Sequence, residues 1–182
     1  MTLSTRRHFL LGAGSCAAAL ILPVRAAQAL ALPPRTPRAL EFVHLHTGER
    51  LSVEYYAQGH YLPDALAAVN RLLRDFRTDE VHPIDPQLLD QLYRVARLTD
   101  TGKPYEIISG YRSPRTNAAL RSRSHGVARR SLHMDGRAID VRLPDVQLAD
   151  LRKAALSMRE GGVGYYPASN FVHLDTGRPR SW

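Results

Sequence analysis

Two segments near the start of the chain alternate apolar and polar residues. They cover residues 39–46 and 51–56, and a Thr-Gly turn lies between them. Alternation with a period of two is typical of half-buried strands, so the pattern predicts a β-hairpin. His44 and His46 fall on one face of its first strand, and we interpret them as surface side chains of a terminal hairpin rather than as metal ligands.

Longer segments have apolar residues at helical spacing. In the clearest one, residues 85–98, Asp85 can cap the helix and Pro86 fits its first turn. Shorter runs with strand-like alternation lie between the helical segments. The predicted helices cover residues 63–76, 85–98 and 145–158, with a basic helical turn at 116–123, and the predicted strands cover 105–109, 139–143, 163–166 and 170–177.

The first 29 residues have the pattern of an export signal. Arg6 and Arg7 precede an apolar run that begins at Phe9, an arrangement that resembles a twin-arginine signal. Glycines and a proline interrupt this run, which is short for a membrane span, so we expect no stable membrane span after cleavage. Cleavage is predicted after Ala29 or Ala31, and an uncleaved anchor is the alternative.

The chain then divides into a signal (1–29), a proline-rich tether (30–39) and one domain (40–182). Its single cysteine, Cys16, lies in the signal, so the mature domain has neither disulfides nor thiolate ligands. Three of the 25 basic residues and none of the 17 acidic residues lie in the signal, which leaves a net charge of 22 − 17 = +5. Such a domain is attracted to anionic wall polymer or lipid headgroups. The export signal predicts a periplasmic location, and with no nucleic-acid-binding motif we expect no nucleic-acid partner.

A histidine and a carboxylate seven residues apart form the first candidate site. His133 precedes a glycine turn, and Asp140 lies in the alternating run at 139–143. Because successive side chains of a strand point to opposite faces, Ile139 and Val141 would face a core and Asp140 the other side. An aspartate on a strand, with a histidine delivered by the preceding turn, suits a metal ion such as zinc.

The last predicted strand supplies a candidate third ligand. Phe171, His173 and Asp175 share one face of this strand, so His173 can join His133 and Asp140 if the two strands are neighbours. Two imidazoles and one carboxylate leave a fourth position for water, which is the arrangement of catalytic zinc. Such a site lowers the pKa of the bound water from ~15.7 towards ~7. A structural role for the histidines is the alternative.

Three motifs are Ser109-Gly-Tyr-Arg112, then Ser131-x-His-x-x-Gly-x-Ala-x-Asp140, and Phe171-Val-His-Leu-Asp-Thr-Gly177. Together they resemble the zinc peptidases of the D-alanyl-D-alanine carboxypeptidase and dipeptidase group, and within it the exported murein endopeptidase K branch. The resemblance covers about residues 40–182. It implies an α+β fold, a small antiparallel sheet with packed helices, similar to Hedgehog-type and D,D-peptidase domains.

By position, the resemblance implies that His133, Asp140 and His173 bind Zn²⁺. It also implies that Arg112 stabilises the tetrahedral oxyanion and that Ser131 helps to hold the substrate. A peptide carbonyl under attack develops negative charge, which a fixed arginine fork can stabilise. The implied activity is hydrolysis of peptide cross-links in peptidoglycan, at bonds of meso-diaminopimelate.

One position departs from the pattern of the family. Relatives commonly place Glu, Asp or His two or three residues before the last zinc-binding histidine as a general base, whereas this chain has Asn170 and Phe171 there. Asp175, on the same strand face as His173, is our candidate for the base or for a group that orients the histidine. His125 is a second candidate base, and capping of the following turn is the alternative role for Asp175.

Basic residues are concentrated in the segment before the candidate ligands, and we predict that residues 121–130 form a solvated loop. Murein peptides carry carboxylates, which a basic rim can steer or bind. Arginines that only keep an exported domain soluble are an equally compatible interpretation. The rim comprises Arg115, Arg121, Arg123, Arg129 and Arg130.

These observations predict a monomeric periplasmic zinc endopeptidase that acts on the peptide stems of peptidoglycan. Two alternatives stay open. One is a D,D- or L,D-carboxypeptidase that trims stem peptides. The other is a non-catalytic wall-binding module that keeps zinc as a structural ion, which the missing base motivates.

Overall fold

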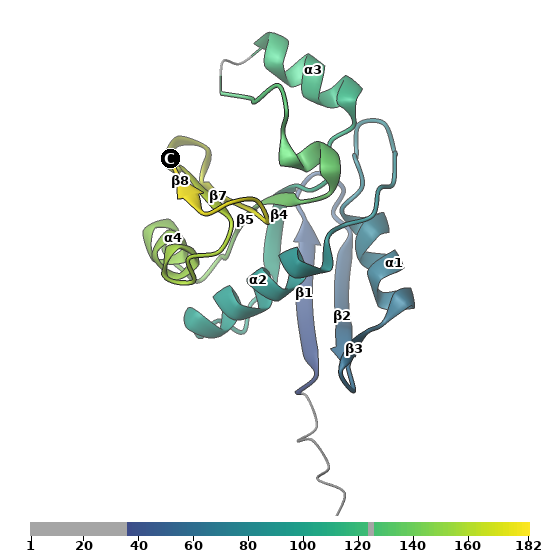
Figure 1. Ribbon diagram of the computed structural model, residues 1–182, viewed down its shortest axis with the longest axis vertical. Helices are drawn as coiled ribbons and strands as arrows, with labels where there is room; N and C mark the ends of the chain where they lie inside the picture. Colours follow the sequence, from purple (N-terminus) through teal and green to yellow (C-terminus); the bar gives the residue numbers. More distant parts are fainter. Residues whose placement is uncertain (1–35, 124–125) are drawn as a thin grey trace, which may run out of the picture. The chain divides into compact units, whose positions relative to one another are not determined.

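The computed structural model of the protein describes residues 36–123 and 126–182 (Figure 1). The predicted signal at 1–29, its cleavage site and most of the predicted tether at 30–39 lie outside the described residues, as does His125. The first strand begins at Arg38. Regular structure therefore starts inside the predicted tether.

The helices and strands agree with most of the predicted segments. Two very short strands, β3 and β8, and the 3₁₀ helices η1 and η2 are additional. In chain order the elements are β1 (Arg38–His44), β2 (Arg50–Ala57), β3 (His60–Tyr61), α1 (Pro63–Leu72), α2 (Pro86–Leu98), β4 (Tyr105–Ser109), α3 (Pro114–Arg123), η1 (Leu132–Asp135), β5 (Ala138–Arg142), α4 (Leu148–Ser157), β6 (Gly162–Tyr166), η2 (Pro167–Ser169), β7 (Phe171–Asp175) and β8 (Arg180–Ser181).

The strands form one eight-stranded sheet in the order β3-β2-β1-β4-β5-β7-β6-β8. This confirms the predicted α+β class, but the sheet is larger than predicted and is not purely antiparallel. β1 pairs with β4 and β6 with β8 in parallel. The parallel pair in the centre arises because α1 and α2 lie between β1 and β4 in the chain, so the chain crosses over before it adds the next strand.

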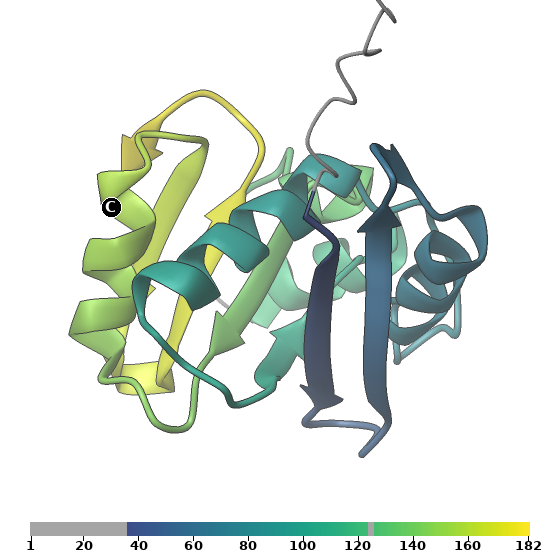
Figure 2. The same ribbon diagram turned by 90° about the horizontal axis from the view of Figure 1, so that it is seen from below.

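Helices α2 and α4 lie side by side on one face of the sheet (Figure 2). The apolar side of α2 is fully buried, and it includes Leu88, Leu92 and Val95. Val172 and Leu174 of β7 belong to the same hydrophobic core. The remaining face of β5 and β7 is thereby left for polar residues, because side chains alternate along each strand.

His44 does not lie at the surface, so that prediction is wrong. Its side chain is buried, and its ring lies 5.4 Å, centroid to centroid, from that of Phe76. Helix α1 was predicted to extend to Phe76 but ends at Leu72, because Asp75 instead accepts hydrogen bonds from the amides of Arg77 and Ser113. The turn that follows brings Phe76 back over the end of β1.

This burial gives a testable pH dependence. Burial lowers the pKa of His44 below its ordinary value of 6.5, so the unfolded chain takes up this proton before the folded protein does. Below pH 6.5 the folded state therefore loses stability relative to the unfolded state, by ~1.4 kcal/mol for each unit of pKa depression. We measure the free energy of unfolding in urea for wild type and for His44→Gln. When the pH is lowered from about 7.5 to about 5.5, we expect this free energy to fall more for wild type than for the variant. His60→Gln, on exposed β3, is the control, and an identical pH response in both variants would contradict the expectation.

None of the helices within residues 36–123 and 126–182 has the length and apolar character required to cross a membrane.

Candidate metal centre

The register of two strands places Asp140 beside His173. β5 and β7 are antiparallel neighbours in which Asp140 pairs with His173 and Ile139 with Leu174. Ile139 and Leu174 point into the hydrophobic core, so the polar pair points to the opposite face. Nδ1 of His173 lies 2.9 Å from Oδ1 of Asp140.

His133 reaches this pair from η1, the short 3₁₀ helix before β5. Gly136 ends η1 with a φ of 64°, a left-handed conformation that favours glycine. A Cβ at this position would also lie 2.0 Å from the carbonyl oxygen of Pro83. Only glycine therefore allows the turn that sends the chain from His133 into β5.

Each imidazole donates from one ring nitrogen to a protein oxygen and turns its other nitrogen toward the other imidazole. His133 donates Nδ1–H to the carbonyl oxygen of Gly110 at 2.7 Å, and His173 donates Nε2–H to Oδ2 of Asp175 at 3.1 Å. The remaining nitrogens lie 3.2 Å apart beside the Asp140 carboxylate. Two nitrogen lone pairs at this distance require a positive charge between them, either a proton or a metal ion.

The donor set fits zinc. One nitrogen from each histidine and one oxygen of Asp140 lie within 4.8 Å of one another, and all three residues are buried. Two imidazole nitrogens and one carboxylate oxygen are zinc ligands in catalytic sites, and the hydrogen bond that each imidazole donates on its other side is the usual means of fixing such a ligand.

Burial and charge set the protonation states of these ligands. Burial acts to raise the pKa of Asp140, but His133, His173 and Arg112 outweigh it and hold the pKa of this carboxyl well below its ordinary range. Burial lowers the pKa of His133 despite the attraction of Asp140. The carboxylate is thus ionised and this imidazole neutral at neutral pH, which are the forms that bind a metal ion.

Asp175 is fully buried, and both of its oxygens are occupied. Oδ1 accepts hydrogen bonds from the amides of Gly162 at 2.9 Å and Gly177 at 2.8 Å, and the Arg180 guanidinium donates to Oδ1 at 3.0 Å and to Oδ2 at 2.6 Å. Burial acts to raise the pKa of Asp175, but His173, Arg180 and the two amides hold it below its ordinary range. A carboxylate held in this way is a weak proton acceptor that orients the imidazole and caps the following turn.

Arg112 follows β4 and contacts Asp140 directly. Its Nε donates to Oγ of Ser109 at 2.8 Å, and its Nη2 forms an ion pair with Oδ2 of Asp140. The amide of Arg112 donates to the carbonyl oxygen of His133 at 3.1 Å. The Ser-Gly-Tyr-Arg motif therefore holds both the arginine and a candidate ligand, since its glycine carbonyl binds the His133 ring.

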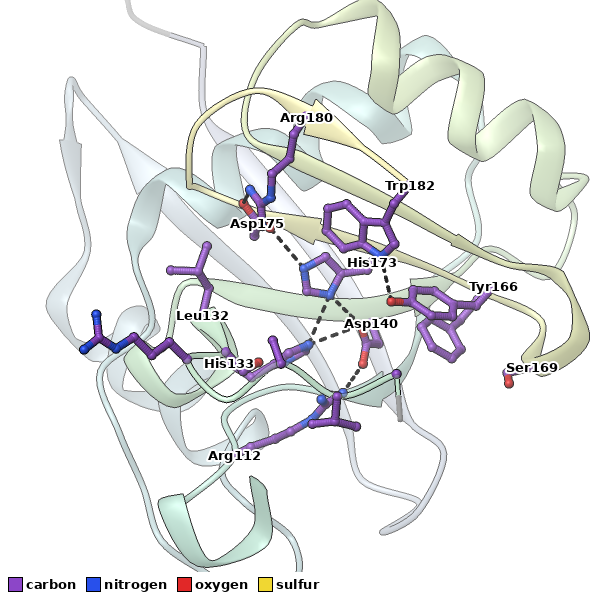
Figure 3. Close-up of a pocket in the computed structure, with 16 residues that line it drawn as sticks. Arg112, Leu132, His133, Asp140, Tyr166, Ser169, His173, Asp175, Arg180 and Trp182 are labelled. Carbon is purple, nitrogen blue, oxygen red and sulfur yellow. Dashed lines mark hydrogen bonds and ion pairs between the residues drawn. The ribbon is translucent and has the colours of Figure 1, made fainter. Parts of the chain in front are cut away.

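The three candidate ligands line a pocket of about 340 Å³ (Figure 3). Arg112, Ser131 and Asp175 line the same pocket, so the structure brings together the residues that the motifs singled out. Members of the predicted basic rim are divided between two surfaces. Arg130 lines this pocket, whereas Arg115 and Arg123 line a separate groove beside α3.

Sequence reasoning missed one side of the pocket, which we call the aromatic wall: Tyr166, Phe171 and Trp182. The rings of Tyr166 and Phe171 stack with centroids 4.6 Å apart, and the Trp182 ring lies 5.3 Å from that of His173. Alternation places Phe171 on the strand face of His173, but it does not indicate the stack with Tyr166. The available signal was that Trp182 is the only tryptophan of the chain.

Comparison with known proteins finds similarity over almost the whole chain. A family model described as peptidoglycan L,D-endopeptidase MepK matches residues 33–182. The chain is 48% identical over 179 residues to the peptidoglycan L,D-endopeptidase MepK of Escherichia coli strain K12. These aligned residues cover 98% of this chain and 97% of that protein. It is 46% identical over 147 residues to the probable peptidoglycan L,D-endopeptidase MepK of Haemophilus influenzae, covering 80% of this chain and 79% of the relative. No solved structure matches the chain, and the likeness to Hedgehog-type domains stays a prediction.

Proposed function

Because the chain belongs to the peptidoglycan L,D-endopeptidase MepK family, we propose that this peptidase uses zinc to hydrolyse peptide cross-links of peptidoglycan. The observation that carries the proposal is the convergence of His133, Asp140 and His173 in one pocket, with their ligand atoms within 4.8 Å of one another. Family membership supports the peptidase activity, and the donor chemistry supports the metal.

Each residue has a distinct role in this proposal. His133, Asp140 and His173 hold the zinc ion, which when bound supplies Lewis acidity toward the peptide carbonyl and the attacking water. The guanidinium of Arg112 stabilises the negative charge that develops on the carbonyl oxygen. Asp175 orients the imidazole of His173. Because both of its oxygens already accept hydrogen bonds, this role is better supported than the role of a general base.

The pocket is compatible with a substrate that carries carboxylates. Three arginines and two aspartates line it, which leaves one positive charge in excess, and guanidinium groups bind carboxylates well. Arg112 and Arg180 are paired with Asp140 and Asp175, so Arg130 is the candidate for this contact. Ser131 is proposed to hold the peptide. The relatives are named for L,D bonds, so we propose that an L,D bond at meso-diaminopimelate is cleaved.

A digest of purified cross-linked muropeptide dimers tests the function. We expect the zinc-loaded protein to release monomers, a chelator to stop release, and added zinc to restore it. Conversion of pentapeptide to tetrapeptide without loss of dimer would replace the proposal with a carboxypeptidase. Binding to sacculi with zinc retained and no turnover would replace it with a wall-binding module.

The proposed substrate places the protein outside the cytoplasm. We propose export by the twin-arginine route because Arg6 and Arg7 precede an apolar run. Fractionation of cells that express the Arg6→Lys, Arg7→Lys variant tests the route, and normal export of that variant would exclude it.

Replacing Asp175 with asparagine separates its two candidate roles. In wild type the Asp175 carboxylate accepts a hydrogen bond from Nε2–H of His173. The side-chain NH2 group of an asparagine could instead face this N–H, so that two donors would oppose each other. We expect the dissociation constant for zinc, measured by competition with a chelating dye, to rise about 10- to 100-fold, as for other partners of metal-bound histidines. Turnover at saturating zinc should fall much less.

Asp135→Asn is the matched control, because Asp135 is an exposed acid of η1. Unchanged zinc affinity with turnover lost in Asp175→Asn would identify Asp175 as the base after all.

A further inference from the structure

Within the aromatic wall, Trp182 forms a hydrogen bond with Tyr166. The indole Nε1–H lies 2.7 Å from the Tyr166 hydroxyl oxygen (Figure 3). An indole nitrogen can only donate, so the tyrosine oxygen must accept in this bond. The hydrogen of the Tyr166 hydroxyl is therefore not used in the bond to Trp182. Because one lone pair of the hydroxyl oxygen is occupied, the directions in which this hydrogen can point are restricted.

The chain is built to bring the indole to this place. Gly164 of β6 lies opposite His173 in the sheet, and a Cβ at Gly164 would lie 2.8 Å from the Trp182 ring. The absence of that side chain leaves room for the indole over β6, next to His173. The amide of Trp182 donates to the carbonyl of Val163 at 3.3 Å, and its carbonyl accepts from the amide of Tyr165 at 3.0 Å.

Further contacts fix both side chains. The Arg180 guanidinium lies 4.9 Å from the centre of the Trp182 ring, a cation–π distance. Phe171 stacks on the Tyr166 ring at 4.6 Å. Both members of the pair thus have packing partners as well as the bond between them.

The Tyr166 hydroxyl is a neutral hydrogen-bond donor on the side of the pocket where His173 lies. Asp140 and Asp175, two acids that line the pocket, act as acceptors for the histidines and arginines around them. Figure 3 shows the Tyr166 hydroxyl end turned toward the side of the pocket where His173 and Asp140 lie. A peptide in this pocket offers carbonyl and carboxylate oxygens that need donors.

We propose that the Tyr166 hydroxyl, oriented by the indole of Trp182, donates a hydrogen bond to an oxygen of the bound peptide stem and so positions the peptide beside the candidate metal ligands. This inference rests on the proposed function, because it takes the peptide stem as the ligand. Tyr166 contacts the substrate, and Trp182 is a positioning residue that acts through it.

The test measures binding of an uncleaved tetrapeptide stem to the zinc-loaded protein by titration calorimetry. A neutral hydrogen bond contributes modestly, so we expect Tyr166→Phe to weaken binding about three- to tenfold and to lower kcat/KM on dimers by a similar factor. Zinc content should stay as in wild type, and urea unfolding should change little, because the phenyl ring can still stack on Phe171 and the lost hydrogen bond to Trp182 is exposed. The control is Tyr165→Phe: strand alternation turns Tyr165 to the other face, where Arg152 lies 5.0 Å from the centre of its ring, and no loss is expected.

A double-mutant cycle tests the role of Trp182. We expect Trp182→Phe to cause a smaller loss than Tyr166→Phe, and the double variant to lose no more than Tyr166→Phe alone, because the indole acts through the hydroxyl. In wild type, the emission of the single tryptophan should change on peptide binding, and Tyr166→Phe should alter the emission of the free protein.

Two results would overturn the inference: equal binding by Tyr166→Phe and Tyr165→Phe, or fully additive losses in the cycle. Failure of the proposed function is distinguishable from both, because it would appear as absence of dimer cleavage by wild type, whereas the calorimetric comparison needs no turnover.

Discussion

Replacing His133 with alanine should lower kcat/KM for cross-link cleavage by about 10³-fold or more and release the bound zinc. The variant leaves two of three candidate ligands. The expected defect therefore exceeds that of any residue that only orients a ligand. Zinc content of the purified variant and monomer release from muropeptide dimers are the two measurements.

The variant also leaves the Gly110 carbonyl without the 2.7 Å hydrogen bond from Nδ1 of His133. An unsatisfied buried acceptor costs about 1–3 kcal/mol, so circular dichroism must show that the variant is folded. His60→Ala is the matched control because His60 lies exposed on β3, and it should keep full activity. Full zinc content and normal turnover in folded His133→Ala would remove the proposed metal site.

Replacing Arg112 with lysine should lower kcat about 10²-fold while zinc content is retained, as when other oxyanion-stabilising donors are removed. The guanidinium donates to Ser109 through Nε and binds Asp140 through Nη2. A lysine ammonium is a single point charge that cannot reproduce this fork. Metal analysis together with kcat and KM on dimers provides the measurement.

The ion pair between Arg112 and Asp140 raises a second possibility, namely that the arginine only anchors a ligand. In that case Arg112→Lys would lose zinc affinity and regain wild-type kcat when saturated with zinc, which would refute the oxyanion role. Arg142→Lys serves as the control, because Arg142 of β5 likewise pairs with a carboxylate, that of Glu106 at 2.5 Å.

Much of the site was predictable because it depends on local alternation. A period of two along residues 139–143 and 170–177 assigns Asp140 and His173 to the polar faces of their strands, and a glycine turn delivers His133. Those features are encoded within a few residues of each ligand. The pairing of β5 with β7, which the site also needs, depends on how the core closes and could only be assumed.

The features that were missed depend on contacts between distant segments. His44 shares the face of β1 that carries buried Leu40 and Phe42, but the contact with Phe76 that covers it comes from a turn far along the chain. Trp182 reaches His173 only because Gly164 leaves room for the indole. Likewise, the central parallel pair of strands follows from the path of the chain through α1 and α2, which periodicity does not describe.

Gly110 connects the pocket to the hydrophobic core. A Cβ on Gly110 would lie 2.5 Å from the carbonyl oxygen of Leu73, and that same oxygen accepts a hydrogen bond from the amide of Tyr111 at 2.8 Å. Leu73 is itself fully buried. The backbone of Leu73 therefore helps to hold Gly110, whose carbonyl accepts the hydrogen bond from the His133 ring. A substitution in the core that moves this stretch of backbone would then also disturb a candidate metal ligand.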